Sequence, residues 1–262
     1  MSKAINKQLL KIEKQETKYL EKSNKRLEAN ESSIGKKIED KIPQKLRDTL
    51  YHAFYKSFNL VFDKGSDYIE KTYNKEDIML EHDLNDIAID RKSTKKYVKR
   101  MDKKGNRSKL VHKSIATLEG GVLGLLGIGL PDIPIIISLT MRQIYEICLS
   151  YGYDYKKEDE KAYILLLICG ALSNGSKQIM YNEKIDELAR QIDNNYVPTI
   201  SLEDQIKEAS SVLADYLLIA KFIQGIPLIG LVGGIVNNII ISRVANFGKL
   251  KYKKRYLLSK IS

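Results

Sequence analysis

Apolar residues recur at helical spacing along most of the chain, and no stretch alternates apolar and polar residues long enough to predict a β-strand. The clearest pattern follows Pro43, where an apolar residue recurs every four positions: Leu46, Leu50, Phe54, Phe58 and Phe62. Residues at this spacing share one face of a helix, so we expect a core helix that ends near Gly65. A further amphipathic helix is expected over residues 75–101. The whole pattern predicts an all-α, multi-helix bundle.

The N-terminal segment has a weaker pattern, with few apolar positions among many Lys and Glu residues. Such a segment is typical of a solvated helix or a partly ordered tail. We therefore interpret residues 1–36 as a charged N-terminal extension and residues 37–262 as the helical domain. Within this domain, residues 37–114 form an amphipathic, basic half and residues 115–262 form an apolar half.

The apolar half contains two glycine-bearing blocks, residues 118–130 and residues 222–242. Each has a Gly-x-x-x-Gly pair, which lets helix backbones approach closely in lipid or in a dry core. These pairs are Gly120 with Gly124, and Gly230 with Gly234. We expect two glycine-rich apolar helical hairpins that pack against each other. A membrane span needs about 20 apolar residues, and Pro227 interrupts the second block, so membrane insertion and a buried core remain alternatives.

An aspartate, Asp132, stands between Pro131 and Pro134 in the most apolar stretch of the chain. Pro131 disfavours a helix at the residue before it, and Asp is a strong N-cap. Asp132 is therefore expected to cap a helix that begins at Ile133, in a tight turn between two apolar helices. The alternative is a polar anchor at the tip of a hairpin that dips into a membrane.

Residues that could carry chemistry are few. Arg142 and Glu146 lie four positions apart on the helix after Asp132, where an ion pair is expected and a proton or ligand site is the alternative. The three histidines have no metal-ligand spacing, and the glycine-rich run has no P-loop ending. Cys148 and Cys169 lie in apolar runs and are expected to be free core thiols. We expect no enzymatic activity, no metal and no cofactor.

Charge is unevenly distributed along this chain, whose formal net charge is +11. Residues 1–114 hold 28 Lys and Arg against 18 Asp and Glu, whereas residues 115–262 hold 16 against 15. A first cation cluster runs from Arg91 to Lys113 and includes Lys95, Lys96, Lys99, Arg100, Lys103 and Lys104. A second closes the chain with Lys249, Lys251, Lys253, Lys254, Arg255 and Lys260.

These cation clusters flank the apolar half, so both are expected to face an anionic membrane surface, where each cation contributes about 1 kcal/mol. The representative contacts are Lys95, Lys96, Lys99, Arg100, Lys103, Lys104, Lys253, Lys254 and Arg255. A solvated face is one alternative. Nucleic acid bound by residues 91–113 is another, but Tyr97 is the sole aromatic there and no specific nucleic-acid motif occurs.

Three segments resemble one known family. "GLLGIGLPDIPIIISLTMRQIYEICLSYGYD" (residues 124–154) is similar to the signature region of the EcsC protein family. "QGIPLIGLVGGIVNNIIISRVANF" (residues 224–247) resembles its other apolar block, and "KIPQKLRDTLYHAFYKSFNLVF" (residues 41–62) resembles its opening helix. The resemblance extends from about residue 37 to the end, and the positions that match the family pattern are Asp132, Pro134, Arg142, Tyr151 and Gly152.

The resemblance implies a helical fold and a membrane-transport setting, because the family is named for a product encoded beside an ABC-type transporter. It brings no active site, and no oligomeric state is indicated. The N-terminus lacks the layout of a signal peptide, so a cytoplasmic protein is expected. Our leading hypothesis is a non-enzymatic protein on, or partly inserted into, the inner membrane face, accessory to transporter subunits. The alternatives are a soluble helical module for a lipid or apolar ligand, and a nucleic-acid-binding protein.

Overall fold

The computed structural model describes residues 2–30, 42–92, 95–104, 132–198, 200–224 and 234–261. All regular secondary structure within these ranges is helical, and they contain no strand. The predicted all-α class is therefore confirmed.

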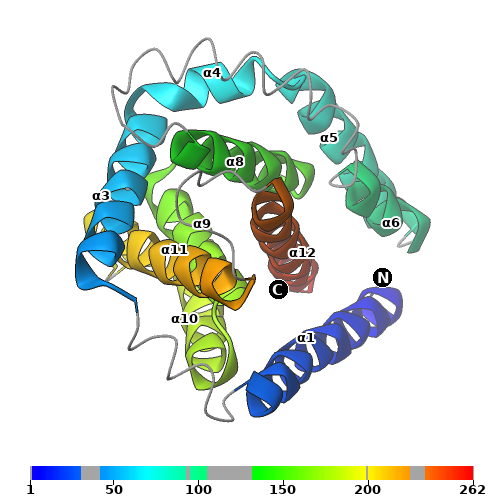
Figure 1. Ribbon diagram of the computed structural model, residues 1–262. Helices are drawn as coiled ribbons and strands as arrows, with labels where there is room; N and C mark the ends of the chain where they lie inside the picture. Colours follow the sequence, from blue (N-terminus) through cyan, green and yellow to red (C-terminus); the bar gives the residue numbers. More distant parts are fainter. Residues whose placement is uncertain are drawn as a thin grey trace.

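An arc of helices runs around one side of the molecule (Figure 1). It consists of α3 (Gln44–Leu60), the π-helical turn η1 (Val61–Gly65), α4 (Ser66–Glu70), α5 (Lys75–Lys92) and α6 (Lys95–Lys104). Within the arc lies α8 (Asp132–Ser150), which packs against α3, α4, α5 and α6. Where the sequence predicts one helix over residues 75–101, the structure has two, α5 and α6.

The helical path continues through Gly65, where the sequence predicts an end. α3 passes through η1 into α4, which turns away from the direction of α3 (Figure 1). A glycine inside a helix costs only about 1 kcal/mol relative to alanine. Burial of Val61 and Ile69 on either side outweighs this cost. The Ser66 hydroxyl also donates a hydrogen bond to the Val61 carbonyl at 3.0 Å, so this carbonyl of the π-helical turn has a hydrogen-bond donor.

The centre of the core is α9 (Glu158–Leu172), in which every residue from Ala162 to Leu172 is buried. A helix that is apolar on all sides has to be covered on all sides. Its covering helices are α10 (Gly175–Asp193), α11 (Leu202–Gln224) and α12 (Gly234–Ser259). Cys169 on α9 and Cys148 on α8 are free and buried, which confirms the predicted core thiols.

Within the described part of the chain, α8 is the one helix long and apolar enough to cross a membrane, over Ile133–Ser150. In this structure 78% of that stretch is buried inside the protein. Core packing in the fold is sufficient to explain its apolar composition, because a buried core helix and a spanning helix share the same length and hydropathy.

The N-terminal segment forms a long helix, α1 (Ser2–Asn30), that packs against α12 and α10. Ile5 and Ile12 are buried, and the ring of Tyr19 stacks on Phe247 with 5.1 Å between ring centroids. These three side chains are seven residues apart, so they lie along one face of the helix. Residues 2–30 are thus a helix held on the domain by its own apolar face.

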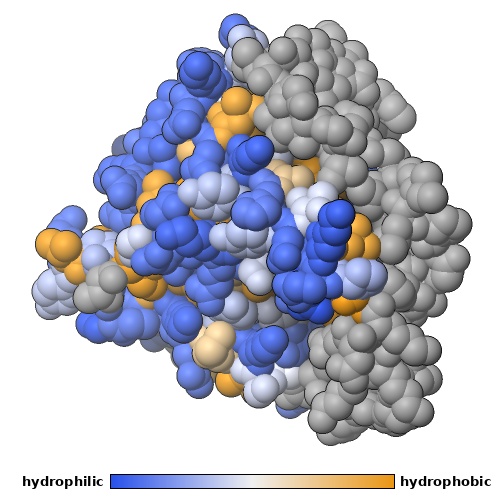
Figure 2. All heavy atoms as spheres, turned by 60° about the vertical axis from the view of Figure 1, so that its left-hand side comes forward, coloured by the Kyte–Doolittle hydropathy of each residue, from blue (hydrophilic) through white to orange (hydrophobic). Residues whose placement is uncertain are grey.

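Where the structure describes it, the surface on the left-hand side of Figure 1 is mainly hydrophilic, with apolar residues scattered over it (Figure 2). Scattered apolar side chains are normal on a globular surface.

The predicted glycine hairpins fall largely outside the described residues. Gly120, Gly124 and Gly230 lie in segments that the structure does not describe, and Gly234 is the first residue of α12. α8 begins at Asp132, next to the predicted start at Ile133. The side chain of Asp132 also lies outside the described part, so its capping role and the packing of the two hairpins stay predictions.

Candidate functional site: a basic pocket between α1, α6 and α12

The buried pair predicted on α8 is present. The Arg142 guanidinium lies 2.7 Å from the Glu146 carboxylate, and both side chains are almost fully buried. Arg142 also donates to the Thr72 hydroxyl at 2.8 Å, which ties α8 to the turn between α4 and α5. This arrangement matches the predicted structural ion pair, because a buried guanidinium needs both a counter-charge and hydrogen-bond acceptors.

The remaining family-pattern positions on α8 shape the ends of that helix. Pro134 is buried in the first turn, where a missing N–H costs nothing. Tyr151 is buried, and Gly152 has φ +82°, a left-handed conformation that favours glycine. A Cβ atom at Gly152 would lie 2.4 Å from Nε2 of His82 on α5. Backbone geometry and the neighbouring imidazole therefore both require a glycine here.

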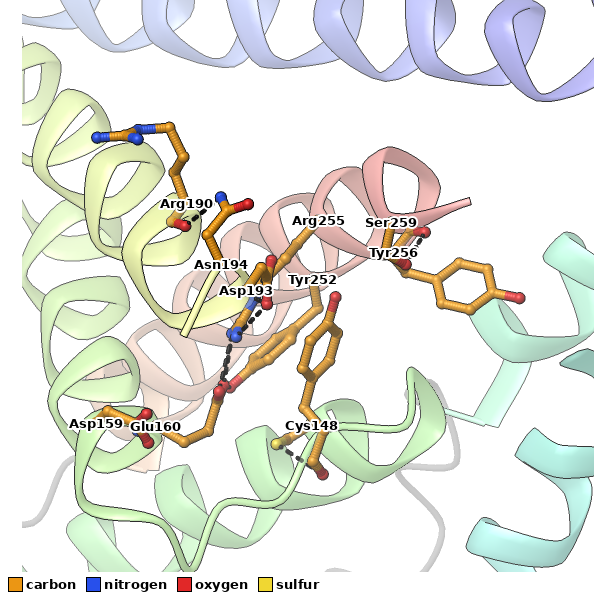
Figure 3. A network of polar contacts seen from close by, with 11 residues as sticks. Cys148, Asp159, Glu160, Arg190, Asp193, Asn194, Tyr252, Arg255, Tyr256 and Ser259 are labelled. Atoms are coloured by element: carbon orange, nitrogen blue, oxygen red, sulfur yellow. Dashed lines mark hydrogen bonds and ion pairs between the residues drawn. The ribbon is translucent and has the colours of Figure 1, made fainter. Parts of the chain in front are cut away.

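The interior contains a charged network around Arg255 of α12 (Figure 3). The Arg255 guanidinium donates to Glu160 of α9 at 2.8 and 3.0 Å and to Asp193 of α10 at 2.9 Å. The Tyr252 hydroxyl donates to Glu160 at 2.6 Å, and the Tyr153 ring lies 4.0 Å from the guanidinium carbon. The side chains of Arg255 and Glu160 are each only 3% exposed. Arg255 is thus buried, and its predicted place on a membrane-facing surface is wrong.

Burial and pairing act in opposite directions on the acid–base behaviour of this network. Burial raises the pKa of Glu160 above its ordinary value, although the Arg255 charge and the Tyr252 hydroxyl oppose this rise. Burial by itself lowers the pKa of Arg255, but Glu160 and Asp193 more than compensate, so the net shift is upward. The arginine therefore stays charged and holds three helices together.

A second group of ion pairs fastens α1 to the domain. Lys251 is buried and donates to Glu16 of α1 and Asp186 of α10. Lys254 donates to the same two carboxylates at 2.6 and 2.8 Å. Lys254 was predicted to face a membrane, but in the structure its ammonium group is engaged inside the protein. In this group, the positive charges of the two lysines are balanced by the negative charges of the two carboxylates.

An open pocket of about 380 Å³ lies beside this group, between α1, α6 and α12. It is lined by Gln8, Lys11, Ile12 and Gln15 of α1, Lys99 of α6, and Asn246, Lys249, Leu250 and Lys253 of α12. Of the lining residues that the structure describes, four are lysines, three carry amides, two are aliphatic and none is Asp or Glu. The described lining is therefore rich in lysine and compatible with an anionic ligand.

The two main walls of the pocket repeat one sequence spacing. On α1 the lining residues are at i, i+3, i+4 and i+7 from Gln8, and on α12 they are at the same spacing from Asn246. This spacing places side chains on one face of a helix. Both walls begin with an amide, continue with a lysine and then have an aliphatic residue. Each helix thus contributes one basic, amide-bearing stripe, and Lys99 comes from a third element.

The pocket unites parts of both predicted cation clusters. Lys99 comes from the first cluster, and Lys249 and Lys253 come from the second. Lys96 and Arg100 are exposed on α6, while the side chains of Lys95, Lys103 and Lys104 lie outside the described part. Lys11 was not predicted, because α1 was interpreted as an extension. The matching i, i+3, i+4, i+7 stripes on α1 and α12 were the signal that would have found it.

The cations of α12 are divided between the interior of the protein and the pocket. The helix carries six cations and no carboxylate. Lys251, Lys254 and Arg255 are bound by carboxylates of α1, α9 and α10. Arg243 donates to the Ala171 carbonyl at 2.9 Å. The other two cations, Lys249 and Lys253, line the pocket and have interaction partners as well. In the ranges that the structure describes, no group of three or more His, Cys, Asp or Glu side chains is placed to hold a metal.

Fold and site together define an all-helical protein with a fully covered central helix and an open, lysine-lined pocket. The sequence profile of the EcsC protein family matches residues 6–257, and the chain belongs to this family. The match begins within α1, much earlier than residue 37, where the resemblance was expected to start. Residues 6–36 are therefore part of the family region.

Two similar proteins come from Bacillus subtilis (strain 168). "Protein EcsC" is 23% identical over 228 residues, which cover 86% of this chain and 84% of that protein. "Uncharacterized protein YdbA" is 26% identical over 151 residues, which cover 56% of this chain and 54% of that protein. The chain thus spans about half the length of the second relative. No solved structure matches the chain.

Proposed function

We propose that this protein is a non-enzymatic, peripheral protein of the cytoplasmic membrane face, and that it docks on anionic lipid through its basic pocket. The exposed cations of α6, Lys96 and Arg100, add to the same contact. In this proposal the α12 cations that are bound to carboxylates, Arg255 among them, serve the fold and not the membrane.

The observation that supports the proposal is the meeting of four lysines, from three helices, around one open pocket. A cation near an anionic leaflet contributes about 1 kcal/mol. The lysines of the pocket, Lys11, Lys99, Lys249 and Lys253, would add to one another at low ionic strength. Salt screens such contacts, so attachment through the pocket should weaken as ionic strength rises.

An exposed apolar stripe on α5 supports a second, salt-resistant part of the contact. Leu80, Leu84 and Ile87 are 59%, 61% and 51% exposed and lie at i, i+4 and i+7 on one helix face. α5 packs on α6, which carries Lys99 of the pocket. Burying this stripe in the lipid interface would add apolar attraction that salt does not screen.

Vesicle flotation tests the docking. Full-length protein should float with phosphatidylcholine vesicles that contain phosphatidylglycerol, should float less in high salt, and should not float with phosphatidylcholine alone. A quadruple Lys→Gln variant at positions 11, 99, 249 and 253 should lose flotation. The control removes four exposed lysines elsewhere, Lys7, Lys14, Lys56 and Lys177. Equal losses in both variants, or no flotation of the wild type, would refute docking through the pocket.

The stripe is tested separately by Leu84→Glu. This variant should leave the fold intact because Leu84 is exposed, but it should make the remaining attachment fully salt-sensitive. If high salt already releases all of the wild-type protein, the pocket alone carries the contact and the stripe has no role.

An ABC-type transporter is the proposed partner, because the resemblance implies a membrane-transport setting. Site-specific cross-linking from exposed positions on α5 or α6 should label the transporter subunits when vesicles contain them. Labelling that is equally strong from exposed positions on α3 would count against a defined partner surface.

A further inference from the structure

The exposed apolar stripe of α5 has the spacing of a surface that pairs with another helix. α5 lies in the outer arc of helices (Figure 1). Leu80, Leu84 and Ile87 are each more than half exposed and lie at i, i+4 and i+7. Alternating steps of four and three residues are the spacing of the a and d positions of a coiled coil, where each apolar side chain inserts between residues of a facing helix. The stripe therefore matches the a and d positions of a helix pair.

One edge of this stripe is acidic. Glu76, Asp83 and Asp90 are seven residues apart, so they follow the stripe along one side of the helix. All three are exposed, and Asp90 remains 47% exposed although it binds Lys260 at 2.9 Å. With the apolar stripe at the a and d positions, these acids occupy consecutive g positions. Charges at e and g decide which helices can pair.

We infer that the α5 stripe binds a basic amphipathic helix, with apolar residues at its own a and d positions and Lys or Arg beside them. The inference rests on the docking function proposed above, which brings α5 to the membrane interface. An anionic lipid surface covers apolar side chains but repels the acidic edge. A helix with a basic edge covers the same side chains and also compensates the carboxylates.

The acidic edge favours a different protein over a second copy of this chain. In an antiparallel pair of identical α5 helices, the g positions of the two copies face each other, so their carboxylates would be juxtaposed. In a parallel pair, the g positions face the e positions, and those of α5 are Glu81 and Ala88. Neither arrangement places a cation opposite the acidic edge, and like charges across an interface select against that pairing.

The membrane interface is a place where helices of the required composition occur. Cytoplasmic segments of membrane proteins carry an excess of Lys and Arg within about 15–20 residues of a membrane span. The exposed cations Lys96 and Arg100 lie on α6, which packs against α5, so lipid can contact α6 while a helix lies on α5. The partner class is therefore a basic juxtamembrane helix of an integral membrane protein.

Fluorescence anisotropy with two designed peptides tests the apolar part of the surface without a membrane. Both probes are labelled amphipathic helices with Leu at a and d, and they differ only in having Lys or Glu at e and g. Full-length protein should bind the Lys probe and not the Glu probe. Leu84→Ala should weaken binding of the Lys probe about tenfold, which corresponds to about 1.4 kcal/mol. Met79→Ala is the matched control, because Met79 is 46% exposed on α5 but lies outside the stripe, and it should bind like the wild type.

Charge reversal tests the acidic edge. Glu76→Lys/Asp83→Lys should weaken binding of the Lys probe and create binding of the Glu probe. The control Glu13→Lys/Glu183→Lys makes the same change in net charge at exposed positions of α1 and α10, and it should keep the wild-type preference. All four positions are exposed, so thermal melts should stay close to that of the wild type. Equal binding of both probes by the wild type, or the same switch in the control, would overturn the inference.

Vesicle flotation and sedimentation separate this inference from its alternatives. Flotation of the wild type with phosphatidylglycerol vesicles, without binding of either probe, would overturn the inference and leave the docking proposal standing. Binding of the Lys probe without flotation would support the helix-binding stripe and refute the docking proposal. A dimer in solution that Leu84→Ala dissociates would assign the stripe to a second copy and overturn the inference.

Discussion

Replacement of Arg255 by methionine is the sharpest test of the interior network. Arg255→Met keeps much of the volume but removes the charge that compensates Glu160, whose side chain is 3% exposed. Removal of one partner from a buried pair costs about 3–5 kcal/mol. Loss of the stacking on Tyr153 adds about 0.5–2 kcal/mol. We expect a total loss of about 3.5–7 kcal/mol, a large part of a typical stability of about 5–15 kcal/mol.

Urea unfolding followed by far-ultraviolet circular dichroism measures this loss. Glu160→Gln should cost less, about 2–3 kcal/mol, because Arg255 keeps Asp193 and Gln can still accept from Tyr252. The double variant Arg255→Met/Glu160→Gln should be less destabilised than the sum of the two single variants. Strict additivity would show that the two residues do not act as a pair.

The pH dependence of Arg255→Met gives an independent check with a defined sign. Burial already raises the pKa of Glu160, and removal of Arg255 should raise it further. A carboxyl whose folded pKa is raised contributes stability that is fully present below its unfolded pKa and is lost as pH rises through its folded pKa. The variant should therefore recover stability as the solution is acidified from neutral pH toward pH 4.5, the ordinary value for Glu.

A loss below about 1 kcal/mol for Arg255→Met, or a selective loss of vesicle binding with normal stability, would refute a buried role. Either result would indicate that Arg255 lies on the surface, as the sequence predicts.

Three further substitutions test local features. Gly152→Ala should cost about 2–3 kcal/mol, because φ is +82° and the new Cβ would lie 2.4 Å from His82. A thermal melt measures this loss, and a wild-type melting temperature would contradict the requirement for glycine. Burial by itself raises the pKa of Asp86, but Lys260 and a tyrosine hydroxyl lower it below the ordinary 3.8. The Asp86–Lys260 pair therefore stabilises the fold above that pH, and this stabilisation is lost as pH falls through the folded pKa of Asp86. Asp86→Asn should therefore flatten the acid limb of a stability–pH curve by less than about 1 kcal/mol, and an unchanged limb would exclude the pair. Asp132→Ala should cost about 1 kcal/mol while Asp132→Asn is tolerated, as expected for an N-cap, and equal large losses in thermal melts would instead indicate a required charge.

Local pattern in the sequence was sufficient for several features of this protein. Periodicity predicted the helical class, and the apolar runs around Cys148 and Cys169 predicted buried thiols. The spacing of Arg142 and Glu146 predicted their ion pair. These features depend on residues within about one turn of a helix or within one apolar segment, and such relations are visible in the order of residues alone.

The sorting of the charges was decided only by the tertiary structure. Lys253, Lys254 and Arg255 are consecutive in sequence, yet Lys253 lines the pocket, Lys254 binds Glu16 and Arg255 is buried against Glu160. Helical phase shows that consecutive residues face different directions, but it does not show which face meets a carboxylate from a distant helix. Glu16 and Glu160 are 238 and 95 residues away from their partners Lys254 and Arg255. A cation's role depends on whether folding brings such a counter-charge to it, and that juxtaposition is set by the packing of α1, α9 and α12 and not by local sequence.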